Sequence, residues 1–186
     1  MKKTIAIITS DPNSINYEII KKSLFFFKKK NKNNYLFIGS KKLLLKNSIN
    51  TNILNIKNIE WNKHKKKEYL IKSFEEFISL YKEKKVHGLI NLPLNKKDFL
   101  GNSFPGVTEY ISNKFQCSGK ETMLLYNHNF SVSPLTTHLK VKDISKNLTS
   151  KKITNNFINI LTFYQNIIKK KNPIVGILGL NPHNAI

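Results

Sequence analysis

Hydrophobic and polar positions divide the chain into two kinds of segment. Short aliphatic or β-branched runs, several of them followed by turn-forming residues, predict strands. The predicted strands cover residues 4–9, 35–38, 52–56, 86–91, 123–126, 130–135 and 173–180. Longer stretches with apolar residues at helical spacing predict helices at 15–28, 69–81 and 153–168.

This succession indicates the fold class. Strands that alternate with helices predict an α/β fold whose sheet is largely parallel and flanked by helices. No internal repeat or long linker interrupts residues 1–186, which we treat as one α/β region. In such sheets ligands bind beyond the carboxyl ends of the strands, so the residues that follow each strand are the first candidates for function.

Charge adds a second feature. The formal net charge is +21, and all 32 basic residues are lysine. A chain this basic could bind nucleic acid or another anionic surface. However, arginine is the preferred residue for bidentate recognition of phosphates and bases, and the lysines are spread along the chain. We therefore favour solvated lysines without specific nucleic-acid binding over a functional basic surface.

The cellular compartment follows from simpler observations. The single cysteine, Cys117, cannot form an internal disulfide. The apolar run after Met1 is too short for a secretory signal, and no apolar stretch approaches the roughly 20 residues of a membrane span. We expect a cytoplasmic protein that does not enter a membrane.

Two histidines occupy equivalent positions after predicted strands. His138 follows the strand 130–135, and His183 follows the strand 173–180. Imidazole is a common ligand of divalent transition metals, although a single histidine at a strand end is more often a surface or turn residue. A catalytic zinc usually has three protein ligands, so the residues alone indicate an α/β region with an incomplete candidate metal site. The other three histidines receive no role.

Five motifs in order resemble the 4-hydroxythreonine-4-phosphate dehydrogenase family. Residues 136–141 (TTHLKV) and 179–183 (GLNPH) resemble its TTHLPL and GLNPH motifs. Weaker matches are 10–19 (SDPNSINYEI), 91–99 (NLPLNKKDF) and 104–110 (FPGVTEY). The resemblance extends over the whole chain, which corresponds to a little over half of the usual family length.

The resemblance implies a fold like that of isocitrate and isopropylmalate dehydrogenases, incomplete here at the C-terminus. It implies that His138 and His183 are two of three ligands of a divalent metal (zinc, magnesium or cobalt), and that Thr108 binds substrate. The third ligand, a histidine, would lie beyond Ile186, together with further substrate contacts and much of the NAD site. In the family this third ligand comes from the other subunit of a homodimer, whose active sites are shared.

The implied reaction belongs to vitamin B6 biosynthesis. The secondary alcohol of 4-phosphooxy-L-threonine transfers hydride to NAD, and the resulting β-keto acid loses carbon dioxide. A divalent metal suits both steps because it can polarise the hydroxyl oxygen and stabilise the enolate that decarboxylation produces. The sequence does not distinguish NAD from NADP or one metal from another, and it assigns no catalytic or cofactor-binding residue.

Several residues depart from the family pattern. Val107 replaces a substrate-binding histidine, and Ser10, Ser14 and Asn16 stand where the family has glycine. If those glycines need positive φ or close backbone approach, the replacements put the geometry of the first loop in doubt. For Asp11 and Glu18 we favour helix capping and charge complementarity over catalysis. For Asn95 and Lys96 a solvated loop and a substrate contact are equally consistent.

Two alternatives to an enzyme stay open. A non-catalytic remnant of the dehydrogenase is favoured if the chain truly ends at Ile186, because the third metal ligand would then be absent. Sheet surface would also be left uncovered in that case. A basic nucleic-acid-binding protein is less favoured, because it predicts basic and aromatic residues clustered on one face.

Overall fold

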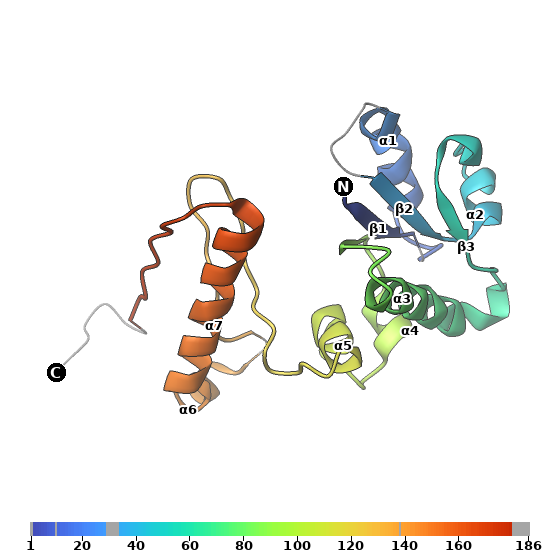
Figure 1. The fold of residues 1–186 in the computed structure, drawn as a ribbon. Coiled ribbons are helices and arrows are strands. Elements are labelled where there is room, and N and C mark those ends of the chain that lie inside the picture. Colours follow the sequence, from blue (N-terminus) through green and yellow to red (C-terminus); the bar gives the residue numbers. More distant parts are fainter. Residues whose placement is uncertain (1, 10, 29–33, 138, 180–186) are drawn as a thin grey trace. The chain divides into compact units, whose positions relative to one another are not determined.

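A computed structural model describes residues 2–9, 11–28, 34–137 and 139–179. The chain divides into two compact units, residues 1–107 and 108–186 (Figure 1). Each unit is described by itself below. Within the described ranges, no helix combines the length and apolar character needed to cross a membrane.

Unit 1 is built on a four-stranded parallel sheet. Its strands are β1 (Thr4–Ile8), β2 (Asn34–Gly39), β3 (Ile56–Asn58) and β4 (Gly88–Asn91). The order in the sheet is β3-β2-β1-β4, and all three pairings are parallel, with Ile8 opposite Ile38 on one side and Asn91 on the other. The predicted parallel α/β sheet is therefore confirmed for this unit.

Helices cover both faces of this sheet. They are α1 (Asn16–Lys28), α2 (Lys41–Lys46), α3 (Lys66–Lys82) and α4 (Lys96–Leu100), with short 3-10 turns at Thr51–Ile53 and Lys63–Lys65. In Figure 1, α1 and α2 lie toward one face, and α3 and α4 lie toward the other. This follows from the order of the strands, because right-handed crossovers in opposite directions place their helices on opposite faces.

The core of unit 1 lies between the sheet and these helices. Ile7 and Phe37 from the strands pack with Ile20 of α1 and Leu44 of α2 in one buried cluster. On α3, the apolar positions that predicted an amphipathic helix are buried, and Phe74 stacks on Phe99 of α4 with ring centroids 4.6 Å apart. The burial of these large side chains supplies the main favourable term for folding of unit 1.

The regular structure in the described part of unit 2 consists of helices and one β-bridge. The helices are α5 (Val107–Lys114), α6 (Ile144–Asn147) and α7 (Ser150–Phe163), with a 3-10 turn at Val141–Asp143 and a π-helical turn at Tyr164–Ile168. The first residue of α5, Val107, is the last residue of unit 1. The π-turn continues α7, so that the predicted helix 153–168 is confirmed in extent. Thr149 caps α7, where its side chain accepts a hydrogen bond from the amide of Lys152 at 3.2 Å.

Four strand predictions differ from the structure in the described residues. Residues 123–126 and 130–135 form a single antiparallel bridge, Leu125 with Val132, where two strands were expected. Residues 173–179 are extended but pair with no described strand, and their side chains are largely exposed. Residues 51–53 form a 3-10 turn, and the strand begins only at Ile56. Apolar runs show β propensity, but a strand also requires a partner on the sheet.

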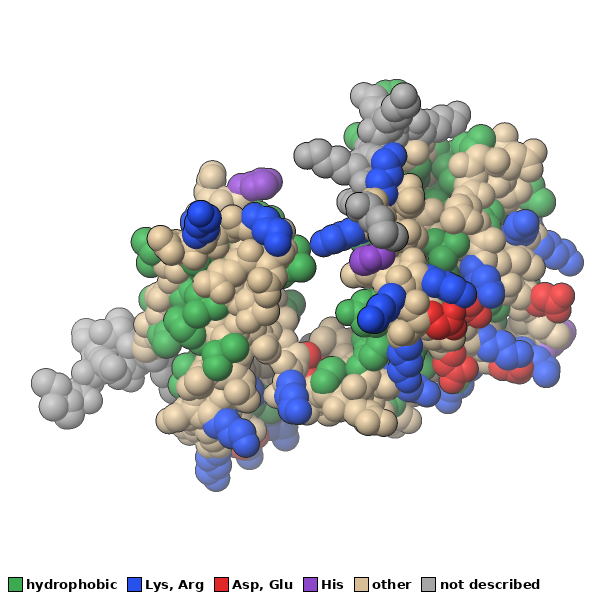
Figure 2. All heavy atoms as spheres, viewed as in Figure 1, with side chains coloured by type: hydrophobic (Ala, Val, Ile, Leu, Met, Phe, Trp, Pro, Cys, Tyr) green, Lys and Arg blue, Asp and Glu red, His purple; other side chains and the backbone are tan. Residues whose placement is uncertain are grey.

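The described lysine side chains on the face drawn in Figure 2 do not gather in one stripe. On the face drawn in Figure 2 they are spread over the surface and are interrupted by acidic and neutral side chains. Several of them pair with neighbouring glutamates, as Lys22 does with Glu18 at 2.7 Å one helical turn away. Exposed pairs of this kind contribute little to stability.

Candidate functional site

The candidate site lies at the carboxyl edge of the sheet in unit 1. The chain leaves β1 for β2 on one side, and β4 is added on the other side of β1. This reversal is a topological switch point, where the loops after the two neighbouring strands diverge and leave room for ligands. The two loops are residues 9–15 after β1 and 92–95 after β4.

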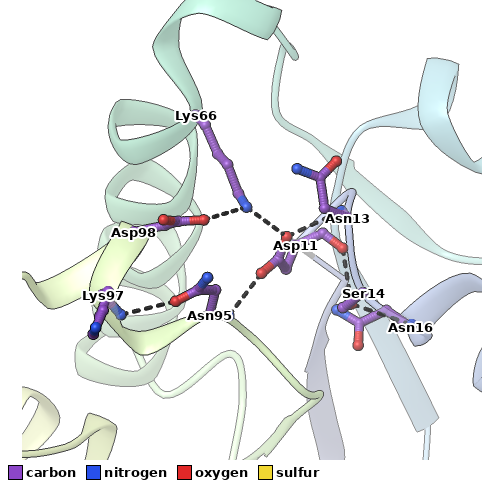
Figure 3. Close-up of polar contacts among 8 residues, drawn as sticks. All are labelled: Asp11, Asn13, Ser14, Asn16, Lys66, Asn95, Lys97 and Asp98. Carbon is purple, nitrogen blue, oxygen red and sulfur yellow. Dashed lines mark hydrogen bonds and ion pairs between the residues drawn. The ribbon is translucent and has the colours of Figure 1, made fainter.

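Asp11 connects these two loops. Its side chain is almost completely buried, at 2% exposure. One carboxylate oxygen, Oδ2, accepts a hydrogen bond from the backbone amide of Asn95 at 2.7 Å, and Oδ1 accepts one from the amide of Asn13 at 3.0 Å (Figure 3). A segment 84 residues away in sequence is thereby held against the end of the first strand.

Lys66, in the first turn of α3, supplies the countercharge. Its ammonium lies 3.1 Å from Asp11 Oδ1 and 2.6 Å from Asp98 Oδ2, between a buried and a half-exposed carboxylate. Figure 3 shows the three side chains converging from the β1 loop, α3 and α4. The cluster therefore ties three elements of unit 1 together at the carboxyl edge of the sheet.

The protonation of this cluster follows from its contacts. Burial alone raises the pKa of Asp11, but the amides of Asn95 and Asn13 and the Lys66 ammonium outweigh it, and the pKa lies below the usual value. Burial lowers the pKa of Lys66, yet its bonds to Asp98 and Asp11 raise it overall. Both groups are charged at neutral pH.

At Ser14 and Asn16 the first loop does not need the glycines of the family pattern. Positive φ angles occur at four described non-glycine residues, and neither Ser14 nor Asn16 is among them. Ser14 instead donates its hydroxyl hydrogen to the carbonyl of Asp11 at 2.9 Å and accepts from the amide of Asn16 at 3.2 Å. Ser10 lies outside the described residues. The replacements at Ser14 and Asn16 are thus accommodated without left-handed backbone.

Two buried polar atoms lie at the start of α1. Within the part of the chain that the structure describes, Asn16 Oδ1 and the Tyr17 hydroxyl have no hydrogen-bond partner. Buried polar atoms are normally paired, and unpaired ones occur at functional sites or beside bound water. Their position one turn beyond Asp11 strengthens the assignment of this edge as the candidate site.

A second polar group stabilises the ends of β1 and β2. The Tyr69 hydroxyl accepts a hydrogen bond from the amide of Ser40 at 2.9 Å, and burial raises its pKa to about 12. Thr9 and Gly39 meet at this point, and a Cβ added at Gly39 would lie 1.9 Å from Thr9 Oγ1. Glycine is required there by close approach of the neighbouring side chain.

The residues proposed from sequence have different outcomes. Asp11 accepts hydrogen bonds from both loops, which is more than the capping role that we favoured. Glu18 is an exposed residue in the first turn of α1. Asn95 caps α4 by accepting from the amide of Lys97 at 3.0 Å, and the Lys96 ammonium donates to the carbonyl of Pro105. Both therefore have structural partners within the loop.

Thr108 and the two histidines are placed as follows. Thr108 is exposed in the first turn of α5. His138 and His183 lie outside the described residues, so their role as metal ligands stays a prediction. Among the residues that are described, no three His, Cys, Asp or Glu side chains come together as a metal site.

Sequence reasoning missed Lys66 and Tyr69. Lys66 belongs to the run Lys65–Lys67, where nothing in the letters separates the half-buried lysine from its solvated neighbours. Tyr69 is the first residue of the predicted helix 69–81, and its hydroxyl contact with Ser40 depends on packing between α3 and the end of β2. Lys66 lies four positions before Leu70, a residue of the buried face of α3. Basic residues at this spacing are too common for the pattern to identify the contact of Lys66 with Asp11 or that of Tyr69 with Ser40.

Together, the parallel sheet, its crossover helices and the buried polar groups at its switch point define an α/β protein with a candidate ligand site at the carboxyl edge of the sheet. The sequence profile of the pyridoxal phosphate biosynthetic protein PdxA family matches residues 2–185. The chain belongs to this family.

Relatives and solved structures agree with this assignment. The 4-hydroxythreonine-4-phosphate dehydrogenase of Sulfurihydrogenibium sp. is 32% identical over 96% of this chain and 63% of its own length. That of Aquifex aeolicus is 30% identical over 98% of this chain and 64% of its own length. The crystal structure of a 4-hydroxythreonine-4-phosphate dehydrogenase from Burkholderia phymatum superimposes with a TM-score of 0.75, at 17% identity, over 98% of this chain and 64% of that one. The chain thus spans just under two thirds of the length of these relatives.

Proposed function

We propose that this chain contributes the first part of an NAD- and divalent-metal-dependent enzyme that oxidises and decarboxylates 4-phosphooxy-L-threonine in pyridoxal 5'-phosphate biosynthesis. The observation that carries the proposal is the family match over residues 2–185, together with relatives that bear the name 4-hydroxythreonine-4-phosphate dehydrogenase. The arrangement at the carboxyl edge of the sheet supports the proposal, because the segment that resembles the family's first motif forms a hydrogen-bonded loop around Asp11 there.

The residues that would hold the metal are His138 and His183. Two imidazoles suit zinc or cobalt better than magnesium, which prefers oxygen ligands. When bound, the metal would supply Lewis-acid polarisation of substrate oxygens, and NAD would accept the hydride. The described carboxylates Asp11 and Asp98 are already engaged by Lys66, so we assign neither of them to the metal.

The chain's own described residues would act by positioning. Asp11 fixes Asn95, and Lys96 holds the carbonyl of Pro105, which lies just before α5 and Thr108. Thr108 is exposed at the start of α5, where its hydroxyl can donate a hydrogen bond to an anionic substrate group. A substrate that carries a phosphate ester would also be attracted by the positive net charge of the chain.

The family resemblance further supports a homodimer of complete chains with shared active sites, which we include in the proposal. The alternative is a non-catalytic remnant. It is distinguished by assaying the product of the complete reading frame for NAD reduction with 4-phosphooxy-L-threonine. Turnover supports the enzyme, and a folded, metal-free and inactive product supports the remnant.

Metal binding can be tested separately from activity. Replacement of His138 by alanine should lower the zinc or cobalt content of the purified protein, while the matched change His64→Ala, on an exposed 3-10 turn, should leave it unaltered. Equal metal content in the two variants would remove His138 from the ligand set. Phosphate-ester binding by Thr108→Val, measured by calorimetry, would test the substrate contact in the same way.

A further inference from the structure

An apolar contact holds α4 against α3. Phe99 of α4 is almost fully buried and stacks on Phe74 of α3, with ring centroids 4.6 Å apart and an angle of 17° between the rings. Parallel rings attract each other over a range of offsets, so this contact keeps the two helices together without fixing the position of α4 along α3. Polar contacts in the first turn of α4 supply that position.

Two polar contacts hold this first turn, and both involve the same charged cluster. The amide of Asn95, which caps α4, donates to Asp11 Oδ2 at 2.7 Å, and Asp98 Oδ2 lies 2.6 Å from the Lys66 ammonium (Figure 3). Lys66 also lies 3.1 Å from Asp11 Oδ1, and only 18% of its side chain is exposed. A single ammonium therefore joins the two contacts, and the backbone of Lys96, which lies between Asn95 and Asp98, is held from both sides.

The Lys96 side chain connects this turn to the end of the segment. Its ammonium donates to the carbonyl of Pro105, nine residues further along the chain. An ammonium has three N–H donors, so this bond occupies one of them. Because the side chain is exposed, it can offer the others to an anion at the carboxyl edge of the sheet. Lys96 is thus a cation whose backbone and side chain are both positioned before any ligand arrives.

The charge around Lys96 depends on Lys66. Asp11 and Asp98 carry two negative charges, and the Lys66 ammonium lies between them. Without it, both carboxylates would repel an anionic group that approaches Lys96. Asp98, two positions away, would also compete for the Lys96 ammonium. Lys66 therefore has two effects, since it fixes the first turn of α4 and offsets the negative charge beside it.

We propose that Lys96 binds the phosphate group of the substrate and that Lys66 is the positioning residue that holds Lys96 for this contact. The substrate class rests on the proposed function, which supplies a phosphate ester as the ligand. For Lys96, the arrangement favours a substrate contact over the solvated loop that the sequence allowed equally. Lys66 touches Asp11 and Asp98 and acts on the substrate only through them.

The positioning role is tested on the 1–186 chain by amide hydrogen exchange. In Lys66→Met, exchange at Asn95, Lys97 and Phe99 should accelerate by at least about tenfold more than exchange in β1 and β2, because the first turn of α4 opens locally. Lys66→Arg should restore slow exchange. Lys65→Met is the matched control, because Lys65 is 63% exposed and pairs with Glu68 instead; it should leave exchange unchanged.

The phosphate contact is tested by titrating the same chain with O-phospho-L-threonine and following the backbone amides by NMR. We expect shifts centred on Lys96. Lys66→Met and Lys96→Met should each weaken binding by about tenfold, the scale of one charge-assisted hydrogen bond. Lys65→Met removes the same formal charge from an exposed position, so that binding by this variant should stay within about twofold of the wild type. The comparison separates a positioned lysine from general attraction by net charge.

Three results would overturn the inference. One is equal weakening by Lys65→Met and Lys66→Met, and another is a titration that leaves the Lys96 amide unshifted. The third is uniform acceleration of exchange over unit 1 in Lys66→Met, which a merely structural role would produce. If Lys66→Met does not fold, Asp98→Asn replaces it, since it releases α4 and keeps the contact of Lys66 with Asp11; unchanged exchange at Lys97 would then count against the positioning role.

The proposed function can fail separately. Binding of O-phospho-L-threonine at Lys96, without NAD reduction by the product of the complete reading frame, would keep the phosphate contact and remove the dehydrogenase reaction. NAD reduction that is equally fast in the wild type and in Lys96→Met, with an unchanged KM, would keep the reaction and remove the contact.

Discussion

Replacement of Asp11 by asparagine tests the candidate site most directly. The buried carboxylate accepts two backbone amide hydrogens, on different oxygens, and contacts Lys66 through Oδ1. Asparagine keeps one acceptor oxygen, so whichever way its amide is turned, an NH₂ group faces a donor. The change therefore removes the charge, loses one hydrogen bond and places two donors against each other.

The size of the effect follows from these contacts. A hydrogen bond to a charged group is worth about 1.5–3 kcal/mol, and breaking a buried ion pair costs about 3–5 kcal/mol. Lys66 is partly exposed and keeps Asp98 as a partner, which reduces the second figure. We expect Asp11→Asn to lower the free energy of unfolding of unit 1 by about 3 kcal/mol.

Urea unfolding followed by tryptophan fluorescence provides the assay. The single tryptophan, Trp61, lies in unit 1 with its ring 5.1 Å from that of Tyr69, and it reports on this unit alone. Asp98→Asn is the matched control, because Asp98 binds the same lysine but is 41% exposed, and its loss should cost less than about 1 kcal/mol. Equal losses for the two variants would refute the reasoning. So would strict additivity of Asp11→Asn with Lys66→Met, since residues in one ion pair should couple.

Three further predictions use the same fluorescence assay. Gly39→Ala should destabilise unit 1 by about 1–3 kcal/mol, because its Cβ would overlap Thr9, whereas Gly88→Ala meets only an ordinary contact and should change little; equal effects would contradict the steric argument. Phe74→Ala should cost about 3–5 kcal/mol through loss of a fully buried ring, and a cost below 1 kcal/mol would show that α4 does not pack there. The pKa of Asp11 is lowered in the folded state, so the stabilisation that its carboxylate gives to unit 1 is complete above the ordinary carboxyl pKa of about 4 and is lost as the pH falls through the lower folded-state value. Asp11→Asn should remove this acid-sensitive part of the stability. An unchanged dependence of stability on pH in the variant would contradict the prediction.

Unit 1 could be predicted from sequence because its information is local. Alternating apolar runs and helical periodicity identify β1, β2, β4, α1 and α3 to within a few residues. These elements also find their partners within the same hundred residues, so propensity and packing agree. Asp11 could be selected as a motif residue, but its partners Asn95 and Lys66 could not, since both contacts depend on how distant segments meet.

Unit 2 was predicted less well for a physical reason. The residues around Met123, Phe130 and Ile174 have the composition of strands, but strand formation requires a neighbouring strand, and the described residues provide only the bridge between Leu125 and Val132. The structure shows what they form with the partners present in residues 108–179.

The position of β1 in the sheet has a consequence for synthesis of the chain. β1 leaves the ribosome before β2, β3 and β4, yet it lies in the interior of the sheet and pairs on its second side with β4, at residues 88–91. The hydrogen bond from the amide of Asn95 to the Asp11 carboxylate likewise cannot form until Asn95 has emerged. Once β3 (Ile56–Asn58) has emerged, β1 can pair with β2 and β2 with β3, but one edge of β1 stays open until β4 (Gly88–Asn91) has emerged as well. Codons that slow translation between β3 and β4 would prolong that interval, in which an apolar strand edge is available to other nascent chains.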